Sequence, residues 1–352
     1  MTPSIPANVK DRVQRKRNLT RVVQVKKPGG LDQLMLADQE SGEPGPEEIR
    51  VRWHASSLNY HDLLVANGGL PVSDGRIPMS DGAGEIDAVG SAVSRWQKGD
   101  KVMSLFFPDW QEGRHRPERT RAVTGDSIDG CACEYAVLSE NAVTRMPHGL
   151  TYSEAATLPC AGLTAWQALM VRGQMQAGDT LLVQGTGGVS IIALQLAKAA
   201  GVSVVATTSS DAKGERLKAL GADHVINYAE DNDWSDTVKK ITAGGVDHVI
   251  DIGGGATLQH SINAARTSGQ ISLVGILGGV TAKVNVPMIF SKQLKVHGVA
   301  VGSAEMQDAM TRAVENGQIK PVIDADYDIT DIADAFAYQA SAQHFGKITL
   351  AI

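Results

Sequence analysis

Residues 181–190 read LLVQGTGGVS and run directly into the helix-forming segment IIALQLAK at 191–198. The first four residues have the composition of a buried strand, and the segment after the glycines repeats apolar side chains at helical spacing. Gly185 allows a tight turn, and Gly187 or Gly188 lets the backbone approach a pyrophosphate at the helix N-terminus. Because strand, turn and helix follow in this order, the stretch predicts a dinucleotide-binding unit rather than a glycine-rich connection alone.

The residues after the next strand bear on the choice of nucleotide. An NAD site places Asp or Glu at the end of that strand, about 20 residues beyond the glycines. Here residues 205–210 read VATTSS, and the cations Lys213 and Arg216 follow. Hydroxyls and positive charge suit a 2′-phosphate, so we expect NADPH to be preferred over NADH, with Ser209 and Ser210 among its contacts. Asp211 is the counter-argument, and we interpret it as a cap of the next helix.

The remaining pattern divides the chain in two. Before Leu150, short β-branched runs alternate with Gly and Pro clusters, which predicts a mostly antiparallel β-rich domain. After Leu150, buried apolar runs alternate with amphipathic segments, which predicts a doubly wound parallel sheet in an α/β protein. We expect strands at 21–25, 49–53, 84–89, 101–106, 132–138, 180–184, 202–207, 224–226, 248–251 and 270–274, and helices at 190–200, 212–220 and 304–316. The tail from about 305 should rejoin the first domain.

Composition excludes several classes of protein. A chain of 352 residues with 43% hydrophobic and 20% charged residues is typical of a globular protein of two domains. The net charge of −6 argues against nucleic-acid binding, and the basic run Lys10–Arg17 is interpreted as a solvated extension. Three cysteines, no signal-peptide pattern and no apolar run of about 18 residues predict a cytoplasmic protein that does not bind membranes.

From about Thr20 to Ile352 the chain resembles the medium-chain dehydrogenase/reductase superfamily, and specifically its zinc-free quinone oxidoreductase branch. The motifs that carry the resemblance are SLNYHD (57–62), DGAGEI (81–86), GDKV (99–102), LPCAGLTA (158–165), 184–190 and 217–228. The resemblance implies a GroES-like catalytic domain over residues 1–161, a Rossmann NADP-binding domain over 162–302, and a C-terminal segment, 303–352, that returns to the catalytic domain. It also implies a homodimer formed through the edge strand of the Rossmann sheet.

The resemblance further implies cofactor contacts. Thr164 would pack on the nicotinamide, Tyr228 would lie near the adenosine phosphate, and Lys347 would reach a cofactor phosphate. The alternatives are that Lys347 is a surface lysine and that Tyr228 packs at a strand end. The expected set is Thr164, Gly185, Thr186, Gly187, Gly188, Val189, Ser209, Ser210, Lys213, Tyr228, Gly253, Gly275, Ile276, Leu277, Val301 and Lys347.

No metal is expected. The alcohol dehydrogenase branch of this superfamily binds catalytic zinc through Cys at the place of Asn59, His at the place of Ser80 and Cys at the place of Cys160. Two of these three ligands are missing, and zinc needs about three. The four-cysteine structural lobe is reduced to Cys131 and Cys133. His54 and His61 could in principle complete a site with Cys160 and Asp81, but surface or packing histidines are the interpretation that we prefer.

Loss of a Lewis acid favours reduction of a quinone or an α,β-unsaturated carbonyl, because a few donors can stabilise the enolate or quinolate oxygen. The expected catalytic residues are Asn59, Tyr60 and His61, with Asp62 orienting the segment, although water could protonate the product instead. A histidine at position 61 suits proton delivery. Two alternatives stay open: an NAD(P)-dependent alcohol dehydrogenase, and a catalytically silent NADPH-binding sensor or structural protein.

Overall fold

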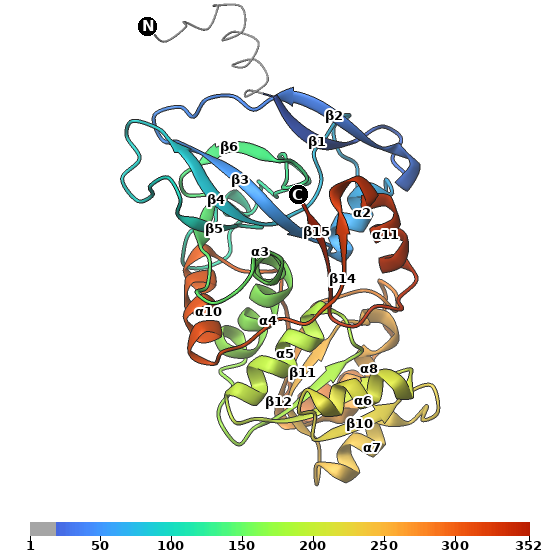
Figure 1. Ribbon diagram of the computed structural model, residues 1–352. Coiled ribbons are helices and arrows are strands. Elements are labelled where there is room, and N and C mark those ends of the chain that lie inside the picture. The colour runs from blue at the N-terminus through green and yellow to red at the C-terminus, as the bar shows by residue number, and fades with distance from the viewer. Residues whose placement is uncertain (1–18) are drawn as a thin grey trace, which may run out of the picture.

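The computed structural model describes residues 19–352, arranged around two sheets with helices between and beneath them (Figure 1). The basic run Lys10–Arg17 lies outside the described residues. Within residues 19–352, no helix is both long and apolar enough to span a membrane.

The lower sheet in Figure 1 is parallel and six-stranded, in the order β10-β9-β8-β11-β12-β13. The chain adds strands outward from β8 to β10 and then returns to build β11 to β13 on the other side, so the order reverses between β8 and β11. This confirms the doubly wound sheet. Its elements are β8 (Thr180–Gln184), α5 (Gly188–Ala199), β9 (Ser203–Thr208), α6 (Asp211–Ala219), β10 (His224–Asn227), α7 (Trp234–Ile241), β11 (Val246–Asp251), α8 (Leu258–Ala264), β12 (Ala265–Leu273), α9 (Val286–Ser291) and β13 (Lys295–Gly298).

The upper sheet is mixed but mostly antiparallel, in the order β14-β15-β3-β4-β5-β7, with β6 paired to β3 and a separate β1–β2 hairpin. This confirms the β-rich GroES-like prediction. Its elements are β1 (Leu19–Val25), β2 (Leu34–Glu40), β3 (Glu48–Ser57), α2 (Tyr60–Ala66), β4 (Asp81–Val89), β5 (Lys101–Ser104), β6 (Tyr135–Ser139), β7 (Val143–Arg145), β14 (Ile323–Asp328), α11 (Ile332–Ala340) and β15 (Lys347–Ala351).

Outside the C-terminal tail, the strands β2, β7 and β13 were missing from the sequence prediction, and one strand was predicted too long. β7 and β13 have three and four residues, too few to show a period, and β2 has no buried residue. β5 ends at Ser104, although the sequence predicted a strand as far as Phe106.

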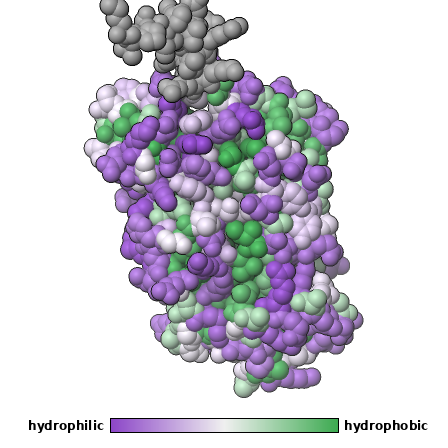
Figure 2. Space-filling view, viewed as in Figure 1, coloured by the Kyte–Doolittle hydropathy of each residue, from purple (hydrophilic) through white to green (hydrophobic). Residues whose placement is uncertain are grey.

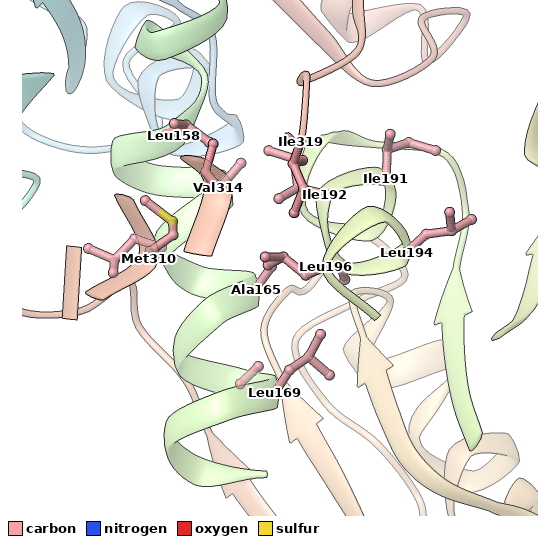
Figure 3. Packing of buried hydrophobic residues seen from close by; sticks show 14 of the residues in the cluster. Leu158, Ala165, Leu169, Ile191, Ile192, Leu194, Leu196, Met310, Val314 and Ile319 are labelled. Atoms are coloured by element: carbon pink, nitrogen blue, oxygen red, sulfur yellow. The ribbon is translucent and has the colours of Figure 1, made fainter. Parts of the chain in front are cut away.

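Helices fill the space between the sheets. A helical run from α3 (Tyr152–Ala156) through α4 (Leu163–Trp166) to Arg172 contains two π-helical stretches and crosses the middle of the molecule. The expected domain boundary at 161/162 falls inside this run. Figure 3 shows its Leu158 beside Val314 of α10 (Ala304–Asn316), and Leu158, Leu169, Ile192 of α5 and Met310 of α10 belong to the largest buried cluster. Figure 2 shows apolar side chains gathered at the centre of one face, at the level where the domains meet.

The C-terminal strand returns to the first domain, as the sequence predicted. β15 pairs antiparallel with β3, placing Thr349 opposite Ser57, and parallel with β14. Just before β15, Gly346 donates its backbone N–H to the Thr186 carbonyl oxygen (2.8 Å). The tail therefore touches both the catalytic domain and the glycine turn.

Candidate dinucleotide and catalytic site

The glycine turn follows β8 and leads into α5. Gly185 has φ +68°, which is the left-handed conformation that a tight turn after a strand requires and that glycine adopts without strain. Gly187 is the N-cap of α5, and the helix begins at Gly188. The first N–H groups of a helix have no intrahelical acceptor, so this turn presents donors and a positive dipole end. The arrangement fits a diphosphate, with Thr186 and Val189 in the same turn.

The two glycines that the sequence could not separate have different surroundings. A Cβ on Gly187 would meet no protein atom within 4 Å. A Cβ on Gly188 would lie 2.5 Å from Cδ of Lys347 and 3.3 Å from Cβ of Ala161. Gly187 therefore leaves space open to a ligand, whereas the space beside Gly188 is filled by the Lys347 side chain. Ser190, in place of the third glycine, is buried and donates its hydroxyl to the Gln184 carbonyl oxygen (2.6 Å).

The residues expected at the adenosine end lie at the carboxyl ends of the neighbouring strands β9 and β10. Ser210 is the N-cap of α6. The sequence analysis assigned this cap to Asp211, which was wrong. Asp211 accepts from the Asn227 side chain (2.9 Å). Lys213 Nζ donates to the Ala342 carbonyl oxygen (2.9 Å), and burial with Arg216 nearby lowers its pKa.

Two further side chains stand at this end. Tyr228 follows β10 directly and is 42% exposed, so it does not simply pack at the strand end. Its N–H donates to the Thr208 carbonyl oxygen (2.8 Å) and ties it beside β9. Arg216 pairs with Asp324 (2.9 Å), and its guanidinium lies 4.0 Å from the ring centroid of Phe345. Ser209, Ser210 and Lys213 thus share one edge with Tyr228.

The loops expected to flank the nicotinamide follow β11, β12 and β13. Gly253 and Gly275 lie in adjacent loops, joined by hydrogen bonds from the Leu277 N–H to the Ile252 oxygen (3.2 Å) and from the Gly278 N–H to the Gly253 oxygen (2.7 Å). Ile276 and Leu277 are exposed. Val301, after β13, is buried with φ +49°, an uncommon conformation for a β-branched residue.

Sequence reasoning missed the residue that organises these loops. Asp251, at the end of β11, is fully buried, and its Oδ1 accepts from the backbone of Gly253 (3.1 Å) and Gly254 (2.9 Å) and from the Thr257 hydroxyl (2.6 Å). Its Oδ2 accepts from Ser261, which in turn accepts from the Gln184 amide. An aspartate closing an apolar strand just before three glycines is the signal that could have found it.

Thr164 lies on α4, immediately after the π-helical turn Leu158–Gly162. π-Helical turns are rare and often occur at functional sites. The Thr164 hydroxyl donates to the Cys160 carbonyl oxygen (2.7 Å), which fixes its rotamer, and the side chain is buried. Burial raises the pKa of the Cys160 thiol well above its usual value, so this cysteine is a neutral, half-buried side chain.

The catalytic segment begins at Asn59, the N-cap of α2, where Asp62 at the third helical position completes a capping box. The Asn59 amide nitrogen contacts Asp62 Oδ2 (3.1 Å), Ser80 Oγ (3.2 Å) and Asp81 Oδ2 (2.9 Å). Its oxygen accepts from Lys347 Nζ (2.6 Å). Both ends of this amide are therefore bound to protein groups, and the expected donation from Asn59 to a substrate is not the arrangement seen.

Lys347 is buried, although the sequence analysis expected it at a cofactor phosphate or on the surface. Its ammonium donates to the Leu58 carbonyl oxygen and to Asn59 Oδ1, both at 2.6 Å, and lies 3.6 Å from Asp81 Oδ2. Burial raises the pKa of Asp81 to about 6, an effect that the Lys347 charge and hydrogen bonds from Asn59 and Ser57 only partly oppose. Burial also raises the pKa of Asp62. We call Asn59, Asp62, Ser80, Asp81 and Lys347 the ammonium centre.

Comparisons with known proteins agree with this geometry. The chain matches the alcohol dehydrogenase GroES-like domain over residues 45–148 and the zinc-binding dehydrogenase domain over residues 188–316. It is 39% identical over 333 residues, 92% of its length, to a zinc-type alcohol dehydrogenase-like protein of Schizosaccharomyces pombe, covering 96% of that protein. The chain belongs to the medium-chain dehydrogenase/reductase superfamily.

Two further relatives extend the range of activities that are named for similar proteins. A quinone oxidoreductase of Pseudomonas aeruginosa is 29% identical over 334 residues, covering 92% of this chain and 96% of that protein. A solved structure from Sinorhizobium meliloti 1021, named as a candidate alcohol dehydrogenase, superposes with a TM-score of 0.90 at 39% identity, covering 95% of this chain and 99% of that one. This medium-chain dehydrogenase/reductase is thus an NAD(P)-dependent oxidoreductase that acts on a small molecule.

The ammonium centre of this dehydrogenase/reductase does not fit a catalytic zinc ion. Within residues 19–352, no three His, Cys, Asp or Glu side chains lie together in a way that could hold a metal. His54 stacks on the Tyr152 ring at 4.3 Å instead of joining Cys160. The Lys347 ammonium already occupies the space beside Asn59 and Asp81, and a second cation there would meet its charge.

Tyr60 and His61 are the predicted catalytic residues whose side chains do not take part in the ammonium centre. Tyr60 is 43% exposed. His61 Nε2 lies 3.2 Å from Asp126 Oδ2, without hydrogen-bond geometry, and the imidazole makes an edge contact with Phe106 at 5.3 Å between ring centroids. Both stand on the first turn of α2, whose start is held by the ammonium centre.

Proposed function

We propose that this enzyme is a zinc-independent, NADPH-preferring reductase of quinones or α,β-unsaturated carbonyl compounds. The observation that carries the proposal is the buried Lys347–Asp81 pair, which binds the side chain of Asn59, one of the positions at which the resemblance places a zinc ligand in metal-dependent relatives. Oxidation of an unactivated alcohol needs strong stabilisation of an alkoxide, the task of a Lewis acid. A conjugated acceptor spreads the same charge over several atoms, so neutral donors suffice.

Bound NADPH supplies a hydride, and an enone accepts it at its β-carbon. The electron pair of the carbon–carbon double bond then moves toward the carbonyl, and the oxygen carries the negative charge. A proton from the Tyr60 hydroxyl, from His61 or from water completes the reduction. Asn59 and Asp62 contribute by holding the start of α2, because their polar atoms are bound within the ammonium centre.

The preference for NADPH is supported by the edge formed by β9 and β10. No carboxylate closes β9, and Asp211 is already bound to Asn227. Lys213 and Arg216 bring positive charge to the same edge as Ser209 and Ser210. A 2′-phosphate placed there would meet donors and cations, as its charge requires.

The proposal also includes a homodimer formed through β13. This strand is the last in the parallel sheet, so one of its edges is unpaired. Exposed apolar side chains occur on β13 and in the segment that precedes it in the chain: Val280, Val286, Phe290 and Val296. Clustered exposed apolar residues at a sheet edge are typical of an interface. Sedimentation that gives a monomer at micromolar concentration would remove this part of the proposal.

The test compares substrates and cofactors on the same preparation. We expect NADPH oxidation with 1,4-benzoquinone or an enone such as 3-penten-2-one, unchanged after dialysis against a chelator, and little NADP⁺ reduction with 2-propanol. We expect the double variant Tyr60→Phe/His61→Ala to lose about 10²-fold in kcat with the enone, which is the size of a general acid's contribution. His224→Ala, at an exposed position on β10, is the matched control.

Other outcomes select the alternatives. Rapid alcohol oxidation that a chelator abolishes would contradict the proposal in favour of a metal-dependent alcohol dehydrogenase. NADPH binding without turnover of any quinone or enone would favour a silent binding protein. Full enone turnover in the double variant would assign protonation to water and remove Tyr60 and His61 from the site.

A further inference from the structure

One side chain connects the glycine turn to the catalytic segment. Lys347 begins β15, directly after Gly346, whose backbone pairs with the turn at Thr186 and Gly187. Its aliphatic stem passes over Gly188, where the missing Cβ leaves room for Cδ. The stem therefore lies against the first residue of α5, the helix whose N-terminus faces the expected diphosphate.

The other end of the same side chain fixes the orientation of Asn59. An ammonium can only donate, and Asp62 Oδ2 and Asp81 Oδ2 both accept from the Asn59 amide nitrogen, so these groups together leave the Asn59 amide one satisfactory orientation. Asn59 caps α2, and the Lys347 ammonium also holds the preceding carbonyl of Leu58. Tyr60 and His61 are the next two residues along the chain.

The burial of this cation shows that the arrangement is specific. Lys347 is 3% exposed and Asp81 is fully buried. A buried charge is tolerated only with a close partner and hydrogen bonds, and breaking such a pair on one side is strongly destabilising. Lys347 has two hydrogen bonds of 2.6 Å and the Asp81 carboxylate at 3.6 Å. Its position is therefore set from two directions: by the turn along its stem and by the ammonium centre at its head.

We propose that Lys347 is a positioning residue that couples dinucleotide binding at the glycine turn to the order of the segment from Leu58 to Asp62. A dinucleotide that fixes the turn also fixes the Lys347 stem, and through the ammonium it fixes the start of α2. Lys347 in this arrangement does not contact the phosphate. The expected effect of Lys347 on turnover rests on the proposed function, in which Tyr60 and His61 deliver the proton. The expected effect of Lys347 on the order of residues 58–62 does not depend on that function.

The test uses Lys347→Met, which keeps the length of the stem and removes the charge, alone and combined with Asp81→Asn. The single variant should lose stability because Asp81 is left buried and unpaired, and the double variant should recover it. We expect kcat at saturating NADPH to fall by about 10²-fold in both, since Asn59 Oδ1 has lost its donor and small displacements of catalytic groups are costly. The NADPH Kd should change less than about threefold, because no phosphate contact is lost.

A second measurement does not depend on turnover. Hydrogen–deuterium exchange of residues 58–66 should slow when NADPH binds the unmodified protein, and it should not slow in either variant. Lys320→Met, at an exposed position near the same tail, is the control and should behave as the unmodified protein does.

Each result has one meaning. An NADPH Kd raised tenfold or more with kcat unchanged would show a phosphate contact and overturn the proposal. Recovery of kcat together with stability in the double variant would reduce Lys347 to a structural role and also overturn it. If the unmodified protein turns over no substrate, the proposed function fails, and exchange of residues 58–66 alone decides the coupling.

Discussion

The glycine turn and the ammonium centre lie against each other, but they are assembled in different ways. The turn is made by consecutive residues, Gly185 to Val189, and the groups proposed to bind the dinucleotide there are backbone N–H groups. The centre is made by side chains from segments that are far apart in sequence, with Lys347 and Asn59 separated by 288 positions. A function carried by backbone geometry is local, whereas a function carried by paired charges depends on the whole fold.

The difference also separates neighbouring residues. Gly187 belongs to the turn, because its missing side chain leaves space toward a ligand. Gly188 belongs to the ammonium centre, because its missing side chain leaves space for Lys347. Two adjacent glycines of one motif are therefore required for different reasons.

The largest expected effect concerns the charge of the centre. The pKa of Asp81 is raised from 3.8 to about 6 by burial, so between these values the unfolded chain loses this proton and the folded protein keeps it. The contribution of Asp81 to stability is full below pH 3.8 and falls as the pH rises to about 6. The measured quantity is the unfolding free energy of the unmodified protein minus that of Asp81→Asn. Between pH 3.8 and about 6 this difference should fall by about 3 kcal/mol.

Asp87→Asn provides the control of opposite sign. Although partial burial acts to raise it, the pKa of Asp87 is held below its usual value by hydrogen bonds from Arg50 and Lys98. Its contribution is therefore present above the unfolded pKa and is lost as the pH falls. If the difference in unfolding free energy between the unmodified protein and Asp81→Asn stays constant between pH 4 and 7, Asp81 is not a carboxyl with a raised pKa in the folded protein.

The next prediction compares Gly187→Ala with Gly188→Ala. Gly187→Ala should fold with unchanged stability and bind NADPH at least tenfold more weakly, because only a ligand meets the added methyl group. Gly188→Ala should lose about 1–3 kcal/mol of unfolding free energy, because its Cβ overlaps the buried Lys347 stem. Thermal unfolding and NADPH titration measure both. Equal losses of stability in the two variants would show that the glycines have one shared role.

The sequence predicted the fold where periodicity and turn chemistry are local. The runs at 180–184 and 248–251 became β8 and β11, and the helix expected at 304–316 is α10. The strand β13, which the sequence did not predict, is a short edge strand stabilised by pairing with its neighbour β12 and not by its own residue pattern. The domain boundaries at 161/162 and 302/303 stay predictions.

The cofactor edge was predictable for a related reason. The carboxyl ends of parallel strands meet at one edge of the sheet, so finding the strands placed Ser209 at that edge, whereas Tyr228 and Gly253 were named from the resemblance. The partners of Asn59, by contrast, depend on how β15 returns to β3, and no local pattern contains that information. The sequence analysis therefore named Lys347 as a site residue but expected it at a cofactor phosphate and not at Asn59.

The smallest effect tests the cofactor edge alone. We expect Lys213→Gln to lower the ratio of kcat/KM for NADPH over NADH by about tenfold, which corresponds to about 1.4 kcal/mol. Arg216→Gln should lower the ratio less, because Asp324 already neutralises much of that charge (2.9 Å). Added salt should reduce the effects of both variants on this ratio, since partly exposed charges are screened.

The exposed Lys218, paired with Glu215, supplies the control Lys218→Gln. A ratio that Lys213→Gln leaves unchanged would place the 2′-phosphate elsewhere and detach the NADPH preference from this edge, while the glycine turn and the ammonium centre would keep their roles.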